Sequence, residues 1–117
     1  MAYVDGFVAA VPTQNRDAFR DHAAHFAKLF KRYGALRIVE CWGDDVPDGE
    51  VTSFPLAVKC QEGETVVFSW IEWPDKASRD ACMQAMMEDP ALAGADMQMP
   101  FDGKRLIFGG FQPILDA

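Results

Sequence analysis

Three carboxylates stand next to large aromatic residues, in stretches whose composition is typical of β-strands. Asp5 lies in YVDGF, Glu40 in VECW and Glu72 in SWIEW. A carboxyl group beside indole rings can have a raised pKa, and it can then act as a general acid or base near neutral pH. One group of side chains is therefore a candidate to line a cleft. The group comprises Asp5, Glu40, Trp42, Phe68, Trp70 and Glu72.

The alternative for these carboxylates is ion pairing across an interface between two protein chains. Arg37, Lys104 and Arg105 are the basic residues that we consider as partners. Structural ion pairs perturb pKa values as readily as catalytic groups do. The sequence therefore identifies candidate cleft residues but no catalytic residue, and it does not decide whether the protein is an enzyme.

The other residues with metal-binding or nucleophilic chemistry do not form a recognisable ligand set. His22 and His25 are three residues apart and share the edge of a predicted helix, while Cys41, Cys60 and Cys82 are dispersed, with no CxxC pair. Structural zinc sites need four converging ligands. We expect both histidines to bond to backbone or water, and we predict that the protein requires no metal, haem or other cofactor.

The hydrophobic pattern predicts elements in the order β-α-β-β-α-β. Strands are predicted over 3–11, 36–42, 64–73 and 105–114, and helices over 13–33 and 75–88, with a short helix within 52–59 entered at Ser53. Gly34 is placed to end the first long helix. This order is the ferredoxin-like split βαβ pattern, and it predicts one α+β domain over residues 1–117.

The faces of the predicted sheet follow from the alternation of side chains along each strand. One face carries small or apolar residues: Val4, Gly6, Val8, Ala10, Val39, Cys41, Val67, Ser69 and Ile71. The other carries the candidate carboxylates and aromatic rings. Unpaired carboxylates under helices would be costly, so we place the candidates on the face turned away from the helices. A second copy of the chain would then cover their aromatic rings.

Four long segments carry a resemblance to a known family. They are YVDGFVAAVP near the N-terminus, AKLFKRYGA at the end of the first helix, VECWGDDVPDG over 39–49 and MPFDGKRLIFGGF over 99–111. Together they make nearly the whole chain resemble the YbaA-like bacterial proteins, a family of unknown function. The resemblance implies the dimeric α+β barrel superfamily, in which two ferredoxin-like units pack sheet to sheet. It carries no catalytic residues with it.

Composition excludes several classes of partner. Of the 117 residues, 18 are acidic and 11 are basic, so the formal net charge is −7. An acidic surface disfavours both nucleic acids and anionic membranes. The N-terminus lacks the basic region of a signal peptide, and no apolar run approaches the length needed to span a bilayer. We expect a soluble cytoplasmic homodimer.

Three classes of function remain open at this point. The first is a cofactor-free enzyme that acts on a small, largely apolar molecule, with Glu40 or Glu72 as base. The second is a module that binds such a molecule in the same cleft without turnover. The third is a structural homodimer whose interface is filled by side chains. An open pocket near Glu40 would favour the first two, and a filled interface would favour the third.

Overall fold

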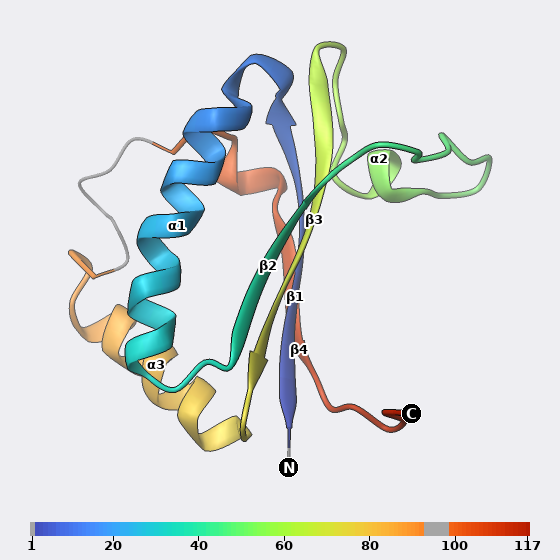
Figure 1. Cartoon of the computed structure of the whole chain (residues 1–117). Helices are drawn as coiled ribbons and strands as arrows, with labels where there is room; N and C mark the ends of the chain where they lie inside the picture. Colours follow the sequence, from blue (N-terminus) through green and yellow to red (C-terminus); the bar gives the residue numbers. More distant parts are fainter. Residues whose placement is uncertain (1, 93–98) are drawn as a thin grey trace.

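The protein folds into a four-stranded antiparallel sheet with two long helices on one face (Figure 1). The computed structural model describes residues 2–92 and 99–117. The strands lie in the order β2-β3-β1-β4. Their bounds are Tyr3–Pro12 (β1), Arg37–Trp42 (β2), Glu64–Trp73 (β3) and Ile107–Phe111 (β4). The helices are Arg16–Arg32 (α1), Phe54–Ala57 (α2) and Lys76–Glu88 (α3), with 3₁₀ turns at Thr13–Asn15 and Gly103–Arg105.

The ends of α1 follow from local sequence. β1 ends at Pro12, and a 3₁₀ turn leads from there into α1. The first turn of the helix contains Asp17, and its last turn contains Lys31 and Arg32. These charges complement the helix dipole. Gly34 adopts a φ of +100°, a conformation that favours glycine, and the chain leaves the helix there.

Side-chain caps begin the other two helices. Ser53 Oγ accepts a hydrogen bond from the Leu56 N–H at 3.1 Å, and Asp75 Oδ1 accepts one from the Ser78 N–H at 2.7 Å. Such caps satisfy backbone N–H groups that a helix leaves free at its start. The predicted entry of the short helix at Ser53 is confirmed.

The core lies between the sheet and the long helices. One cluster joins Phe19 of α1 to Val11 and Val67, and a second joins Ala35, Ile71, Trp73 and Cys82. A third cluster, formed by Ala10, Val58 and Val66, lies on the opposite face of the sheet, where the α2 segment covers one end of the strands. The face turned away from the helices is therefore only partly covered within the chain.

The predicted faces of β1 and β2 are wrong, whereas that of β3 is confirmed. Cross-strand partners share a face, and Glu40 pairs with Ser69 while Ala9 pairs with Val67. Val67 packs on Phe19 of α1, so this parity points towards the helices. The helix side therefore includes Tyr3, Asp5, Phe7, Ala9, Val11, Ile38, Glu40, Trp42, Val67, Ser69, Ile71 and Trp73.

The physical reason is that the two carboxylates on the helix side are not unpaired. Asp5 meets Arg79 and Trp73, and Glu40 meets Ser69. These partners offset the predicted cost at Asp5, whereas at Glu40 the bond from Ser69 offsets only part of it and the side chain stays exposed. The small apolar residues of β1 and β2 instead form the outer face.

Two further expectations concern the C-terminal part of the chain. The last strand is shorter than predicted, because it begins at Ile107 after a 3₁₀ turn and ends at Phe111. The sequence also predicts a bulge or a close backbone approach at Gly109 and Gly110; in the structure it is the Tyr3 side chain that approaches Gly110, and an added Cβ there would overlap Tyr3 Oη. The sequence also predicts an irregular or short helical segment over 90–99, which lies largely outside the described residues.

Candidate functional site

The sheet separates the six predicted cleft residues into two groups. Asp5, Glu40 and Trp42 point to the helix side, and Phe68, Trp70 and Glu72 point to the other face. The six therefore do not line one cleft. Each group has to be considered with its own neighbours.

Asp5 is held in a buried network that stabilises the fold. Asp5 is 3% exposed, and its carboxylate accepts a hydrogen bond from Trp73 Nε1 at 2.9 Å. Arg79 of α3 lies 3.0 Å from the same carboxylate and stacks over Tyr3 at 5.3 Å. The hydrogen bond to Asp5 is the main reason that the pKa of Arg79 is raised. A carboxylate whose oxygens are used in this way is not free to act on a ligand.

Trp42 is also structural. Its ring packs against the Ala9, Val11 and Phe19 cluster, and the Arg16 guanidinium lies 5.6 Å from the ring centroid. A guanidinium over an indole at this distance is a cation–π contact. This contact fastens the first turn of α1 to the end of β2.

The outer-face residues form a small polar group within an aromatic surface. Trp70 Nε1 donates a hydrogen bond to Glu72 Oε2 at 2.9 Å, and Arg37 lies 3.9 Å from the same oxygen. Phe68 packs edge-on against Trp70 and Phe54. The expected pairing of Arg37 thus occurs within one chain.

Arg105 likewise pairs within the chain. Its guanidinium forms two 2.7 Å bonds to the Glu64 carboxylate and a 2.8 Å bond to the Lys59 carbonyl. Both charged side chains are largely buried, and the bidentate bond to Arg105 is the main reason that the pKa of Glu64 is lowered. Arg105 therefore ties the C-terminal segment to β3 and to the loop after α2.

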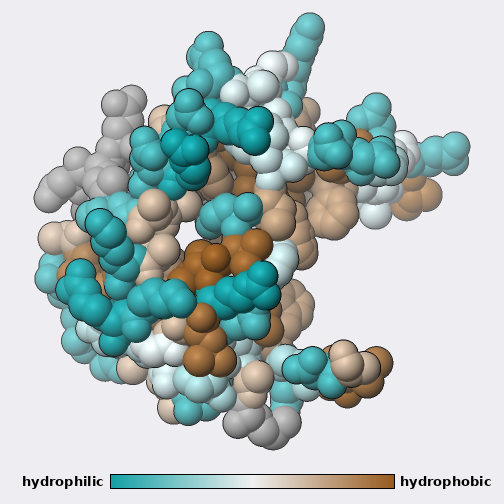
Figure 2. All heavy atoms as spheres, in the orientation of Figure 1, coloured by the Kyte–Doolittle hydropathy of each residue, from teal (hydrophilic) through white to brown (hydrophobic). Residues whose placement is uncertain are grey.

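Glu40 borders a cavity of about 390 Å³ between the sheet and the helices. Figure 2 shows a hollow between α1 and β2 in this part of the molecule. Five phenylalanines dominate the lining: Phe7, Phe19, Phe26, Phe30 and Phe101. Among the described residues, the groups on the lining with polar side chains are Glu40 and Ser69 from the sheet and His22 from α1.

Ser69 is the polar neighbour of the Glu40 carboxyl. The Ser69 hydroxyl donates to Glu40 Oε2, and Ser69 itself is 7% exposed. Burial raises the pKa of Glu40, and the hydrogen bond from Ser69 partly opposes that rise. The Glu40 side chain nevertheless keeps accessible surface, because it faces the open cavity rather than packed atoms. A carboxylate in this position can accept a proton or a hydrogen bond from a molecule in the cavity.

His22 forms part of the helical wall. Its ring lies 4.9 Å from that of Phe26 and 6.2 Å from that of Phe101. Burial, and secondarily the neighbouring His25, lowers the pKa of His22. The imidazole is therefore held towards its neutral form, in which one ring nitrogen donates and the other accepts.

The sequence pattern predicted Glu40 as a candidate site residue but did not predict its cavity. The aromatic stripe on α1 and the position of His22 beside that stripe were visible in the helical spacing. Ser69 was visible as the hydroxyl residue in the middle of the third strand. Glu40, Ser69 and His22 meet because this side of β2 faces the helices, and the pattern assigned that side to the opposite face of the sheet.

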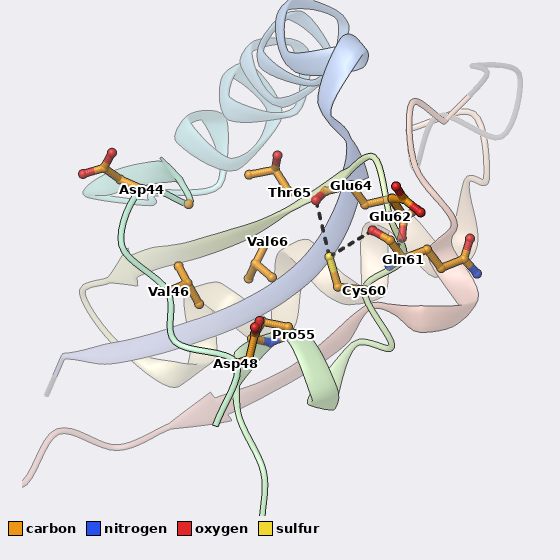
Figure 3. Close-up of a pocket in the computed structure, with 11 residues that line it drawn as sticks. Asp44, Val46, Asp48, Pro55, Cys60, Gln61, Glu62, Glu64, Thr65 and Val66 are labelled. Carbon is orange, nitrogen blue, oxygen red and sulfur yellow. Dashed lines mark hydrogen bonds between the residues drawn. The ribbon is translucent and has the colours of Figure 1, made fainter. Parts of the chain in front are cut away.

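A second hollow, of about 370 Å³, lies among the loops around Cys60 (Figure 3). Asp44, Asp48 and Glu62 contribute to its lining. The Cys60 thiol lies 3.6 Å from the Glu64 carbonyl, and burial with the Glu64 charge raises the thiol's pKa. A protonated thiol is a poor nucleophile and a poor metal ligand. No three His, Cys, Asp or Glu side chains within the described residues come together to hold a metal ion.

Fold and site together define an α+β protein of the ferredoxin-like class with an apolar cavity under its helices. A crystal structure of a dimeric ferredoxin-like protein from an uncultured marine organism superimposes with a TM-score of 0.59. It is 12% identical in sequence, and the match covers 99% of this chain and 98% of the other. At that identity the likeness concerns the fold, and it confirms the ferredoxin-like prediction.

The family follows from sequence. Residues 2–103 match the family described as "Protein of unknown function (DUF1428)". The uncharacterised protein YbaA of Escherichia coli K12 is 61% identical over 116 residues, covering 99% of both chains, and YbaA of Shigella flexneri shows the same values. The chain belongs to this family, and the predicted YbaA-like membership is confirmed. Among the described residues, no helix is long and apolar enough to cross a membrane.

Proposed function

We propose that the protein binds a small, largely apolar molecule in the cavity under α1, with Glu40 as its polar anchor. The observation that supports this is an open, phenylalanine-lined space with one carboxyl group at its wall. Ligand sites in proteins are typically apolar cavities of about 300–1,000 Å³ with a few placed polar groups. A cavity of about 390 Å³ falls in that range.

The size and the polar groups of the cavity distinguish it from a packing defect. Folded interiors leave few voids larger than a water molecule, since each unfilled volume forfeits contacts. A space of this size that also exposes a carboxyl, a hydroxyl and an imidazole has the composition of a recognition site. The same groups would permit proton transfer with Glu40 as base, so binding is the common requirement of both the enzyme and the binding-module hypotheses.

Ligand-observed and protein-observed NMR with a library of small aromatic and alicyclic compounds tests the proposal. Ala23 lines the cavity, whereas its neighbour Ala24 is exposed on the other side of α1. We expect Ala23→Phe to abolish binding by filling the space and Ala24→Phe to leave it intact. Equal binding by both variants, or no binding by the wild type, would contradict the proposal.

We propose further that the outer face of the sheet joins two copies of the chain. Phe68, Ile107 and Phe111 are 40%, 43% and 60% exposed on or beside this face. An apolar groove of about 260 Å³ runs between them over Gly6 and Gly109. Figure 2 shows hydrophobic atoms along this concave side, between the projecting α2 loop and the C-terminal segment. Exposed apolar patches of this kind typically mark interfaces.

The solved structure with the similar fold is described as dimeric, which supports the same assembly here. Light scattering on a gel-filtration peak tests it. The expected mass is about 26 kDa, twice the 13.0 kDa of one chain. A single species of 13.0 kDa at micromolar concentration would contradict a homodimer. A dimer that binds nothing in the NMR screen would instead favour a structural role.

A further inference from the structure

The Glu40 carboxylate meets a hydrogen-bond donor but no cation. In residues 2–92 and 99–117, its hydrogen bond comes from Ser69, and none of the ion pairs includes Glu40. The described part of the cavity lining holds no lysine or arginine. Asp5 and Glu64, by contrast, each have an arginine within 3.0 Å.

A carboxylate drawn partly out of water is stabilised by an opposite charge close to it. Beside Glu40, the described lining has Ser69 and His22 as its polar side chains, and neither is a lysine or arginine. The charge that would complete the site therefore has to come from the occupant. Ser69 uses one carboxylate oxygen, Oε2, which leaves Oε1 available to a second donor.

We propose that the molecule bound in this cavity is a small organic cation, an amine whose ammonium group pairs with Glu40 and whose apolar body packs among the phenylalanines. This inference rests on the proposed binding function and specifies its ligand class. An ammonium group supplies both the missing charge and a donor for the free oxygen.

The remaining lining is suited to such an occupant. Phe7, Phe26 and Phe101 present aromatic rings, whose faces attract a cation, and apolar surface that accepts a hydrocarbon body. His22 is held towards its neutral form and so adds no repelling positive charge. An organic anion would meet the Glu40 carboxylate with no described cation to offset it. The formal net charge of −7 also attracts cations to the protein from solution.

Three compounds of matched shape and different charge provide the test: 2-phenylethylamine, 2-phenylethanol and phenylacetate, each titrated by calorimetry at pH 7 and low salt. A charge-assisted hydrogen bond typically favours the amine over the neutral alcohol by roughly 10-fold or more in dissociation constant. We expect the amine to bind tightest, the alcohol more weakly and phenylacetate least.

Two variants localise the effect. Glu40→Gln keeps the shape of the side chain and removes its charge, so the advantage of the amine over the alcohol is expected to disappear while the alcohol still binds. Glu50→Gln removes the same charge from an exposed loop and is expected to retain the advantage. A thermal melt of each variant confirms that it is folded before titration.

The outcomes separate the two proposals. If the wild type binds the alcohol as tightly as the amine, or if Glu40→Gln retains the preference, the cation is the wrong ligand class and the binding function stands. If phenylacetate binds tightest, the inference is likewise overturned. If none of these compounds and no member of the NMR library binds, the proposed function fails and the inference fails with it.

Discussion

The two faces of the sheet use the same kinds of residue for different purposes. On the helix side, Asp5 and Glu40 both lie among aromatic and apolar neighbours. Asp5 pairs with Arg79 and Trp73, whereas Glu40 meets one hydroxyl, that of Ser69, beside an open space. On the outer face, Glu72 accepts a hydrogen bond from Trp70 and lies near Arg37, and both charged side chains are accessible to solvent. A carboxylate's partners, more than its aromatic surroundings, therefore separate a structural group from a candidate functional one.

The largest expected effect is the loss of folding stability when Asp5 is replaced. Asp5→Ala leaves Arg79 and the Trp73 N–H without their partner, and breaking a buried ion pair by removing one member costs roughly 3–5 kcal/mol. Because Arg79 keeps some access to water, we expect the lower end of that range, measured by urea unfolding. Asp21→Ala breaks an exposed pair of 3.8 Å and serves as the control, with an expected change below about 1 kcal/mol. Equal losses in the two variants would show that the Asp5 network does not stabilise the fold.

A substitution on the outer face of the sheet is expected to weaken dimerisation. Phe68→Asp places a charge in the middle of the proposed interface, and leaving that charge unpaired is expected to weaken dimerisation by ~100-fold or more. Met87→Asp alters an exposed apolar residue on α3, on the other side of the sheet, and is expected to leave the dimer intact. Sedimentation equilibrium of both variants checks this. A Phe68→Asp variant that remains as dimeric as Met87→Asp would place the interface elsewhere.

Gly109 and Gly110 are adjacent in β4 but face opposite sides of the sheet, and an effect of intermediate size is expected there. A Cβ on Gly110 would overlap Tyr3 Oη and lie 2.8 Å from Tyr3 Cε2, so Gly110→Ala displaces the ring that stacks under Arg79. Such overpacking typically costs about 1–3 kcal/mol. A Cβ on Gly109 would meet the Phe111 ring at 3.5 Å, which is ordinary contact, and Gly109→Ala is expected to cost less than about 1 kcal/mol. Thermal unfolding distinguishes them, and the reverse order would contradict the assignment of the two positions to opposite faces.

The smallest expected effect concerns the pH dependence of stability at Glu40. Burial raises its pKa in the folded protein above that in the unfolded chain, so the folded state binds the proton more tightly. Glu40 therefore opposes folding progressively as pH rises from about 4.5 through its raised folded pKa, and this destabilisation is present at pH 7.

Relative to Glu40→Gln, the wild type should thus gain stability as the pH falls from 7 towards 4.5. The carboxyl group faces a cavity accessible to water, which screens the effect, so we expect a relative shift of no more than roughly 3 °C in Tm. Melting curves of both proteins over this pH range measure it. A shift in the opposite direction would mean that Glu40 gains a positive partner in solution.

Much of the fold could be predicted from local sequence because local rules determine it. Ser53 and Asp75 cap their helices through hydrogen bonds three residues ahead, and Gly34 ends α1 because its φ of +100° disfavours other residues. The span of β3 at Glu64–Trp73 agrees with the prediction residue for residue. The element order that these features set is that of the ferredoxin-like fold.

The faces of β1 and β2 were decided only by tertiary structure. Alternation separates two sets of side chains, but both sets in β1 are largely apolar, so the pattern alone does not show which set meets the helices. The decision depended on Arg79, 74 residues from Asp5, and on Ser69, 29 residues from Glu40, whose bonds make a carboxylate tolerable under a helix. The residue type alone makes Glu40 a carboxyl group that is capable of acid–base chemistry. Only the packing of α1 over the sheet placed it at a cavity, because side chains distant in sequence enclose that space.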